Sequence, residues 1–112
     1  MRKDYYPEEL AEIILKRSVC HVMVGAVIAD AYGILAWGPN HIGFDGLGCH
    51  AEAYALSRAN RRRLSNATLY VAAKRKKSGS VVTAKPCENC ALLLRRVRKV
   101  MYRDGLGNWC QL

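Results

Sequence analysis

The second half of this chain has almost no acidic residues. Glu88 is the only Asp or Glu in residues 53–103, a stretch that carries 14 Lys or Arg. The whole chain has 18 basic and 9 acidic residues, for a formal net charge of +9. A deficit of negative charge on this scale indicates a polyanionic partner, nucleic acid before a membrane surface. A solvated basic face that aids solubility is the other interpretation, and charge alone does not separate the two.

Two further absences bear on the compartment. Residues 1–9 hold no apolar core of the kind found in a secretory signal peptide. The mostly apolar run at 19–37 is interrupted by His21 and Asp30, so it predicts two strands rather than a membrane span. We therefore expect a cytoplasmic protein that does not enter a membrane. There, the odd count of 5 cysteines favours thiolate or metal chemistry over a disulfide framework.

Neither an internal repeat nor a linker divides the sequence. With 112 residues, 51% of them hydrophobic and 24% charged, the chain can bury a core, which excludes a disordered tail or a collagen-like fibre. We expect a single domain over residues 1–112.

The order of predicted elements indicates an α/β fold. We expect a three-layer α/β/α sandwich with a mixed sheet of about five strands, in which strands separated by the second and third helices are parallel. The segment 38–48 is too rich in glycine for regular structure. Helices are predicted at 7–18, 49–61 and 86–97, strands at 23–29, 34–37, 68–74, 81–84 and 99–102, and any further strand near 109–112 must return antiparallel.

Two short motifs carry the chemistry, each at the start of a predicted helix. They are His50-Ala51-Glu52 and, at residues 86–90, Pro-Cys-Glu-Asn-Cys. Cys87 and Cys90 are three residues apart at a helix start, so they share a helix face and can hold one metal. With His50 they supply three ligands to a tetrahedral zinc ion. The fourth position stays free for water, as in catalytic rather than structural zinc sites.

Glu52 follows His50 by two residues and can act on a zinc-bound water without occupying the metal. This is the chemistry of hydrolytic deamination. Other interpretations stay open, because an isolated Cys-x-x-Cys is more often a redox pair or half of a structural zinc site. Cys49 or Cys110 could also close the site as a fourth ligand.

The paired motifs resemble the His-x-Glu and Pro-Cys-x-x-Cys signature of the zinc-dependent nucleobase deaminases, the cytidine deaminase-like superfamily. The resemblance covers most of the chain. It implies one Zn²⁺ per chain held by His50, Cys87 and Cys90, zinc-hydroxide attack on C4 of cytosine, and Glu52 as the catalytic proton shuttle.

Substrate contacts can be assigned on the same basis. By position, the resemblance implies that the Ala51 N–H lies near the base and that Asn40 contacts the sugar. In similar polynucleotide deaminases the loop after the strand that corresponds to 99–102 reads the neighbouring base. We therefore expect the turn at 104–109 to have that role in this chain. Further candidates, chosen for a positive charge or a ring that can stack on a base, are Lys85, Arg103, Phe44, Tyr102 and Trp109.

Most of the basic residues fall in three clusters. Two of them are predicted at the C-terminal ends of the second and third helices, where cations suit the helix dipole and lie far from the metal. The clusters are Arg58 with residues 61–63, residues 74–77, and Arg95, Arg96 and Arg98 with Lys99.

Two features depart from the tRNA adenosine deaminases. They are the basic hairpin at 74–77 and the ten residues that follow the predicted strand at 99–102. Both features are similar to small phage, prophage or toxin-type cytosine deaminases. The sequence favours deamination of cytosine to uracil in single-stranded nucleic acid, DNA before RNA. Alternatives are a free nucleoside or nucleotide such as cytidine or deoxycytidylate, a tRNA-type adenosine deaminase, or a non-catalytic zinc module that binds nucleic acid. Expected partners are single-stranded nucleic acid or a pyrimidine nucleotide, and a second copy of the chain at an exposed sheet edge.

Overall fold

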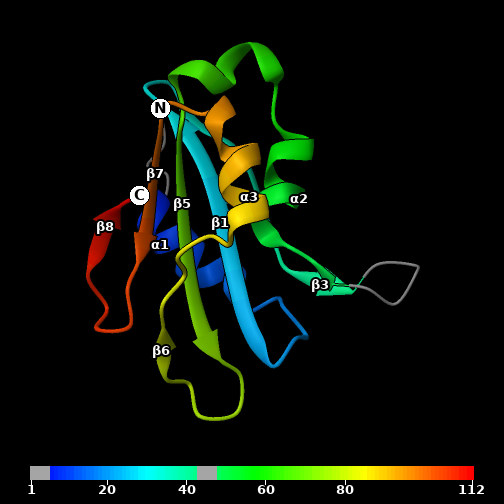
Figure 1. Cartoon of the computed structure of the whole chain (residues 1–112), viewed down its shortest axis with the longest axis vertical. Coiled ribbons are helices and arrows are strands. Elements are labelled where there is room, and N and C mark those ends of the chain that lie inside the picture. Colours follow the sequence, from blue (N-terminus) through cyan, green and yellow to red (C-terminus); the bar gives the residue numbers. More distant parts are fainter. Residues whose placement is uncertain (1–5, 43–47) are drawn as a thin grey trace.

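A six-stranded mixed sheet lies between two helical layers (Figure 1). The computed structural model describes residues 6–42 and 48–112. In chain order the elements are α1 (Pro7–Leu15), β1 (Val22–Asp30), β2 (Gly33–Pro39), β3 (His41–Ile42), β4 (Gly48–Cys49), α2 (Ala51–Arg58), the 3-10 helix η1 (Arg61–Asn66), β5 (Thr68–Arg75), β6 (Val81–Val82), α3 (Glu88–Leu93), the 3-10 helix η2 (Leu94–Arg96), β7 (Lys99–Arg103) and β8 (Trp109–Gln111). No described helix is long and apolar enough to cross a membrane.

The strand order is β2-β1-β5-β7-β8, with β6 paired to β5. β5 and β7 are parallel, as predicted, because α3 and η2 form the crossover between them. β2 and β5, the strands on either side of α2, also run in the same direction, because each pairs antiparallel with β1. They are not neighbours, since β1 lies between them. β8 returns antiparallel to β7, also as predicted.

The two faces of the sheet carry separate cores, which confirms the three-layer sandwich. Successive strand side chains point to opposite faces, so Ile28 of β1 and Leu69 of β5 belong to the larger core beneath α2 and α3. Val27 of β1 and Ala72 of β5, which point to the other face, pack instead with Ala11 and Leu15 of α1.

The helix α1 lies close against β1 at Gly25. A Cβ atom at this position would come within 2.3 Å of the Ala11 carbonyl oxygen and 2.6 Å of the Leu15 backbone nitrogen. Glu12 ties the same helix to the sheet through ion pairs with Lys74 of β5 and Arg103 of β7. Burial raises the pKa of Glu12, but hydrogen bonds from Lys74 and Arg103 outweigh it and hold that pKa below its usual value.

Several predicted segments are shorter or more divided than expected. α1 ends at Leu15, and the predicted helix at 49–61 is split, because the Asn60 side chain accepts a hydrogen bond from the Arg62 N–H and begins η1. α3 covers six residues, Glu88–Leu93, before η2 continues the turn. The segment 38–48 was predicted to be irregular. It instead contains β3 and the first residue of β4, which pair antiparallel.

β2 and β8 end the strand order of the described sheet, and the short strand β6 also pairs on one side only. A homo-oligomer formed at one of these edges stays a prediction.

We expect Gly25→Ala to lower the free energy of unfolding by about 2 kcal/mol or more, and Tm by about 8 °C or more, because the added methyl group meets backbone atoms of α1. Thermal unfolding followed by circular dichroism measures this change. Gly105→Ala is the matched control, since the nearest atom to its added Cβ lies 3.9 Å away. Equal Tm values for the two variants would contradict the close packing of α1.

Candidate active site

The two motifs meet because α2 and α3 begin side by side on one face of the sheet. His50 and Cys87 are the N-cap residues of these helices, both in extended backbone conformation (φ −72° and −70°). Cys90 lies within the first turn of α3 and is buried. Two helix N-termini therefore direct all three side chains to one point.

The three side chains have the geometry of a zinc site. His50 Nδ1 lies 3.0 Å from Cys90 Sγ and 3.8 Å from Cys87 Sγ. The three atoms all lie within 4.8 Å of one another. Tetrahedral zinc, with bonds of about 2.0–2.1 Å to nitrogen and about 2.3 Å to sulfur, needs donor separations of about 3.5–3.8 Å. Small shifts of the side chains reach these separations, so the donor set fits zinc.

Among the described residues, Cys110 is not placed to act as a fourth zinc ligand. Its thiol donates to Asp104 Oδ2 at 3.5 Å in the β7–β8 hairpin, and it lies outside the cluster of ligands. The side chain of Cys49, the other alternative, lies outside the described residues.

Glu52 lies in the first turn of α2 and lines the same cavity as His50 and Cys87. Only 6% of the residue is exposed. Burial raises the pKa of its carboxyl group above the usual value, although a backbone hydrogen bond and the charge of His50 oppose the shift. A carboxyl group in this position is suited to accepting and returning a proton.

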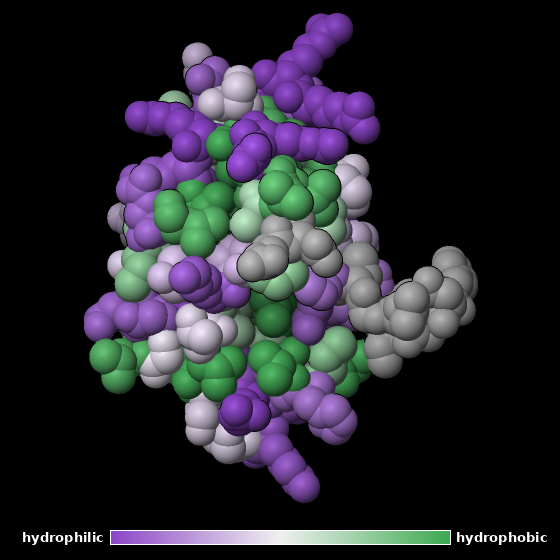
Figure 2. Space-filling model, in the orientation of Figure 1, coloured by the Kyte–Doolittle hydropathy of each residue, from purple (hydrophilic) through white to green (hydrophobic). Residues whose placement is uncertain are grey.

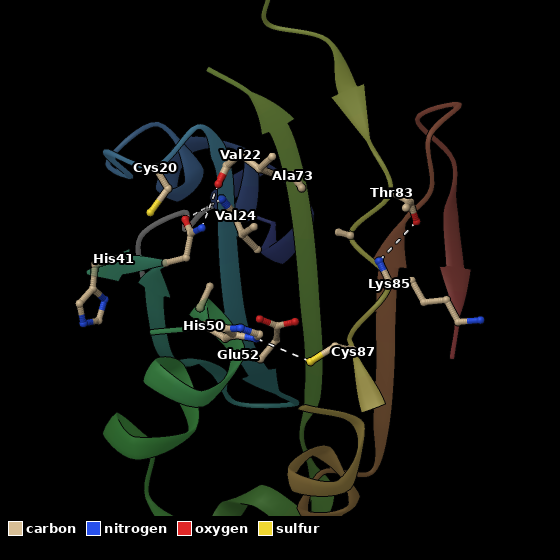
Figure 3. Close-up of a pocket in the computed structure, with 13 residues that line it drawn as sticks. Cys20, Val22, Val24, His41, His50, Glu52, Ala73, Thr83, Lys85 and Cys87 are labelled. Atoms are coloured by element: carbon tan, nitrogen blue, oxygen red, sulfur yellow. Dashed lines mark hydrogen bonds between the residues drawn. The ribbon is translucent and has the colours of Figure 1, made fainter. Parts of the chain in front are cut away.

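The cavity has a volume of about 330 Å³. Figure 3 shows His50, Glu52 and Cys87 close together at one end, and Val22 and Thr83 toward the other. The residues that line it are Cys20, Val22, Val24, Asn40, His41, His50, Ala51, Glu52, Ala73, Thr83, Ala84, Lys85 and Cys87.

Asn40 has a clear structural role in this wall. Its Oδ1 accepts hydrogen bonds from Ser18 Oγ (2.6 Å) and the Val24 N–H (2.9 Å), and its Nδ2 donates to the Val22 carbonyl (2.9 Å). An amide nitrogen carries two hydrogens. The second has no hydrogen-bond acceptor among the described residues and stays available to a ligand.

Three predicted substrate contacts line the cavity, namely Asn40, Ala51 and Lys85. Tyr102 packs against the core on the same side of the sheet, outside the cavity lining. Phe44 lies outside the described residues.

Arg103 and Trp109 are not brought to the cavity. Arg103 donates to Glu12 of α1, and Trp109 packs with the α1-side core and against the Tyr70 ring. Both therefore lie on the opposite face of the sheet. Sequence reasoning missed His41 and Thr83, which line the cavity. The sequence offers one weak indication of their place, because each lies within two residues of a predicted substrate contact.

Fold and site together define a zinc-dependent deaminase. A family model for the cytidine and deoxycytidylate deaminase zinc-binding region matches residues 1–103, and the chain belongs to this family. This confirms the resemblance carried by the two motifs.

The fold is also similar to a solved structure. Cytidine deaminase from Burkholderia pseudomallei aligns with a TM-score of 0.72 and 17% identity, over 95% of this chain and 88% of that one. No curated protein sequence matches the chain.

We expect the purified protein to hold one zinc ion per chain, and Cys90→Ala to lose it, because the thiolate is one of three ligands. Elemental analysis after dialysis measures the zinc content. Cys110→Ala is the matched control and should keep its zinc, since Cys110 lies outside the cluster. Full zinc content in Cys90→Ala would contradict the assigned ligand set.

Proposed function

We propose that this protein deaminates cytosine to uracil hydrolytically, with the cytosine carried in single-stranded nucleic acid, DNA before RNA. The observation that supports the reaction is the shared cavity, in which the buried Glu52 lies beside the His50–Cys87–Cys90 cluster. A structural zinc module would have no use for a buried carboxyl group at the open side of its metal.

His50, Cys87 and Cys90 would hold zinc, which would supply an activated water for addition to C4 of the base. Glu52 would take a proton from the water at its carboxylate and deliver it to N3 of the ring. It would then take a second proton from the new C4 hydroxyl and deliver it to the departing amino group. Cytosine and water thus become uracil and ammonia. The raised pKa of Glu52 supports this role, because a carboxyl group with a pKa nearer neutrality transfers protons in both directions.

The base can be oriented by groups at the start of α2 and on the facing wall. The first N–H groups of a helix have no partner within that helix, and Ala51, the first residue of α2, lines the cavity. Its N–H is suited to the O2 carbonyl of cytosine. The spare Nδ2 hydrogen of Asn40 is suited to a sugar hydroxyl or the ring oxygen.

A basic turn adjoins the end of the cavity away from the metal ligands. Arg75 is paired with Val22 of the cavity wall, and the Lys76 N–H donates to the His21 carbonyl at 2.8 Å. Lys85, from the facing segment, lines the cavity itself. Positive charge at this end favours a substrate with phosphate groups over a neutral nucleoside. The second candidate function, deamination of deoxycytidylate, rests on the same cations, because a single phosphate could use them.

We expect Glu52→Gln to lower kcat by about 10²–10⁴-fold, because the amide cannot carry the proton. The zinc content should stay that of the wild type, since Glu52 lies outside the ligand cluster. Conversion of cytosine to uracil by the zinc-loaded protein is measured in single-stranded DNA, single-stranded RNA, cytidine and deoxycytidylate. Conversion of the free compounds alone would contradict the proposed polymer substrate. An active Glu52→Gln would contradict the mechanism.

We expect Lys76→Gln/Lys77→Gln to raise KM for a cytosine-containing oligonucleotide about fivefold, equivalent to about 1 kcal/mol, through lost phosphate contacts. Steady-state kinetics at fixed ionic strength measures KM. Lys16→Gln/Arg17→Gln removes the same charge from exposed positions at the end of α1 and should leave KM unchanged. An equal KM for both double variants would count against a phosphate role for this turn.

A further inference from the structure

The end of the molecule formed by η1, η2 and the start of β7 carries a second concentration of positive charge, apart from the catalytic cavity. Figure 2 shows hydrophilic side chains gathered at this end, which is the upper end of the view. We call it the basic end surface. Its members are exposed and comprise Arg61, Arg62, Arg95, Arg96, Arg98 and Lys99.

No carboxylate neutralises this surface within the described part of the chain. The ion pairs found there join Asp30 to Arg63, and Glu12 to Lys74 and Arg103. None of them includes a member of the basic end surface. Six uncompensated cations repel one another, so a polyanion that neutralised them would bind favourably.

Helix dipoles do not account for the surface. The sequence predicted that residues 61–63 end the second helix, but α2 ends at Arg58. Arg61 and Arg62 belong to a separate 3-10 helix that begins at the Asn60 cap. Lys99 is the first residue of a strand. Arg95 and Arg96 follow the end of α3 at Leu93 by two and three residues, and Arg61 follows the end of α2 by three. The dipoles therefore leave Arg62, Arg98 and Lys99 unexplained.

Grooves connect the two 3-10 helices and lead along α2 and α3. Arg61 and Arg96 line a groove of about 410 Å³ with Leu64 and Ser65. The same two arginines line a second groove of about 230 Å³, whose other walls are Ala53, Leu56 and Ser57 of α2 and Leu93 of α3. These are the two helices whose N-termini hold His50 and Cys87.

The distance between the two sites suits a short run of nucleotides. The eight residues of α2 span about 12 Å at 1.5 Å per residue. Stacked nucleotides rise about 3.4 Å along one strand, so about three or four of them cover this length. A strand with one cytosine in the catalytic cavity would reach Arg61 and Arg96 within that number.

We propose that the basic end surface binds the phosphate backbone of single-stranded nucleic acid, about three or four nucleotides from the cytosine in the catalytic cavity. This inference rests on the proposed function for its substrate class. Five of the six residues are arginines, whose planar guanidinium groups bind phosphate through two parallel hydrogen bonds. Grooves shared with the catalytic helices favour a strand over a flat anionic membrane.

The decisive measurement is binding, independent of turnover. Zinc-loaded Glu52→Gln protein, alone and with Arg61→Gln/Arg96→Gln, is titrated into a labelled 20-nucleotide single strand at about 50–200 mM salt. Two lost phosphate contacts should reduce the slope of log K against log salt by about 1.4. The ratio of the binding constants, Glu52→Gln protein over the same protein with Arg61→Gln/Arg96→Gln, should then fall about sevenfold between about 50 and 200 mM salt. Adding Lys16→Gln/Arg17→Gln instead removes equal charge at the end of α1 and should change neither value.

The outcomes are separable. An unchanged salt slope in Arg61→Gln/Arg96→Gln would overturn the inference and leave the proposed function standing. Binding of phosphatidylserine vesicles that depends on these arginines, without an effect on DNA, would also overturn it. The predicted slope change in a protein that deaminates no cytosine compound would support the inference and refute the proposed function. Arg95→Gln/Arg98→Gln, which alters other exposed members, gives the same test if the first variant does not fold.

Substrate length provides the second readout, in protein that keeps Glu52. For the parent protein, kcat/KM should rise as the oligonucleotide is lengthened from three to about eight nucleotides, when the strand reaches the basic end surface. Arg61→Gln/Arg96→Gln should lose this rise and keep the parent kcat/KM on the trinucleotide. A length dependence equal in the two proteins would contradict the inference.

Discussion

The candidate active site depends on one arrangement: α2 and α3 begin side by side on the same face of the sheet. His50 and Cys87 are N-caps in extended conformation, and this backbone geometry turns both side chains toward the gap between α2 and α3. The first N–H groups of each helix have no partner within that helix. One local geometry therefore provides the metal-binding side chains and leaves the Ala51 N–H free to meet a ligand.

The parts of the site predicted from sequence are those that short spacing determines. Cys87 and Cys90 are three residues apart at a helix start, and Glu52 follows His50 by two, so no long-range information was needed to bring each pair together. For the two pairs of residues to meet, α2 and α3 needed only to lie on the same face of the sheet. The β5–β7 crossover satisfies this requirement, because it places α3 beside α2 over the larger core.

The substrate contacts were harder to predict because the face of a strand residue depends on register and on distant partners. Arg103 carries the charge expected of a phosphate ligand, yet Glu12, 91 residues away, binds it on the α1 side. Trp109 pairs with Arg103 and shares that face. Helix ends were equally hard to place, since one side-chain hydrogen bond at Asn60 moved Arg61 and Arg62 from an α-helix into η1.

The distribution of positive charge follows from the chemistry at the centre. A cation packed against Cys87, Cys90 and His50 would compete electrostatically with a divalent metal. Among the described lining residues Lys85 alone is a lysine or arginine, and Figure 3 shows its side chain directed away from His50 and Cys87. Lys85 and the turn at 75–77 lie beside the cavity walls, and the basic end surface lies beyond the helices. Under the proposed function, this arrangement favours a polymer over a free nucleotide, because one phosphate can occupy only one of the two regions. In that complex a strand would hold its base in the catalytic cavity and direct its phosphates toward both regions.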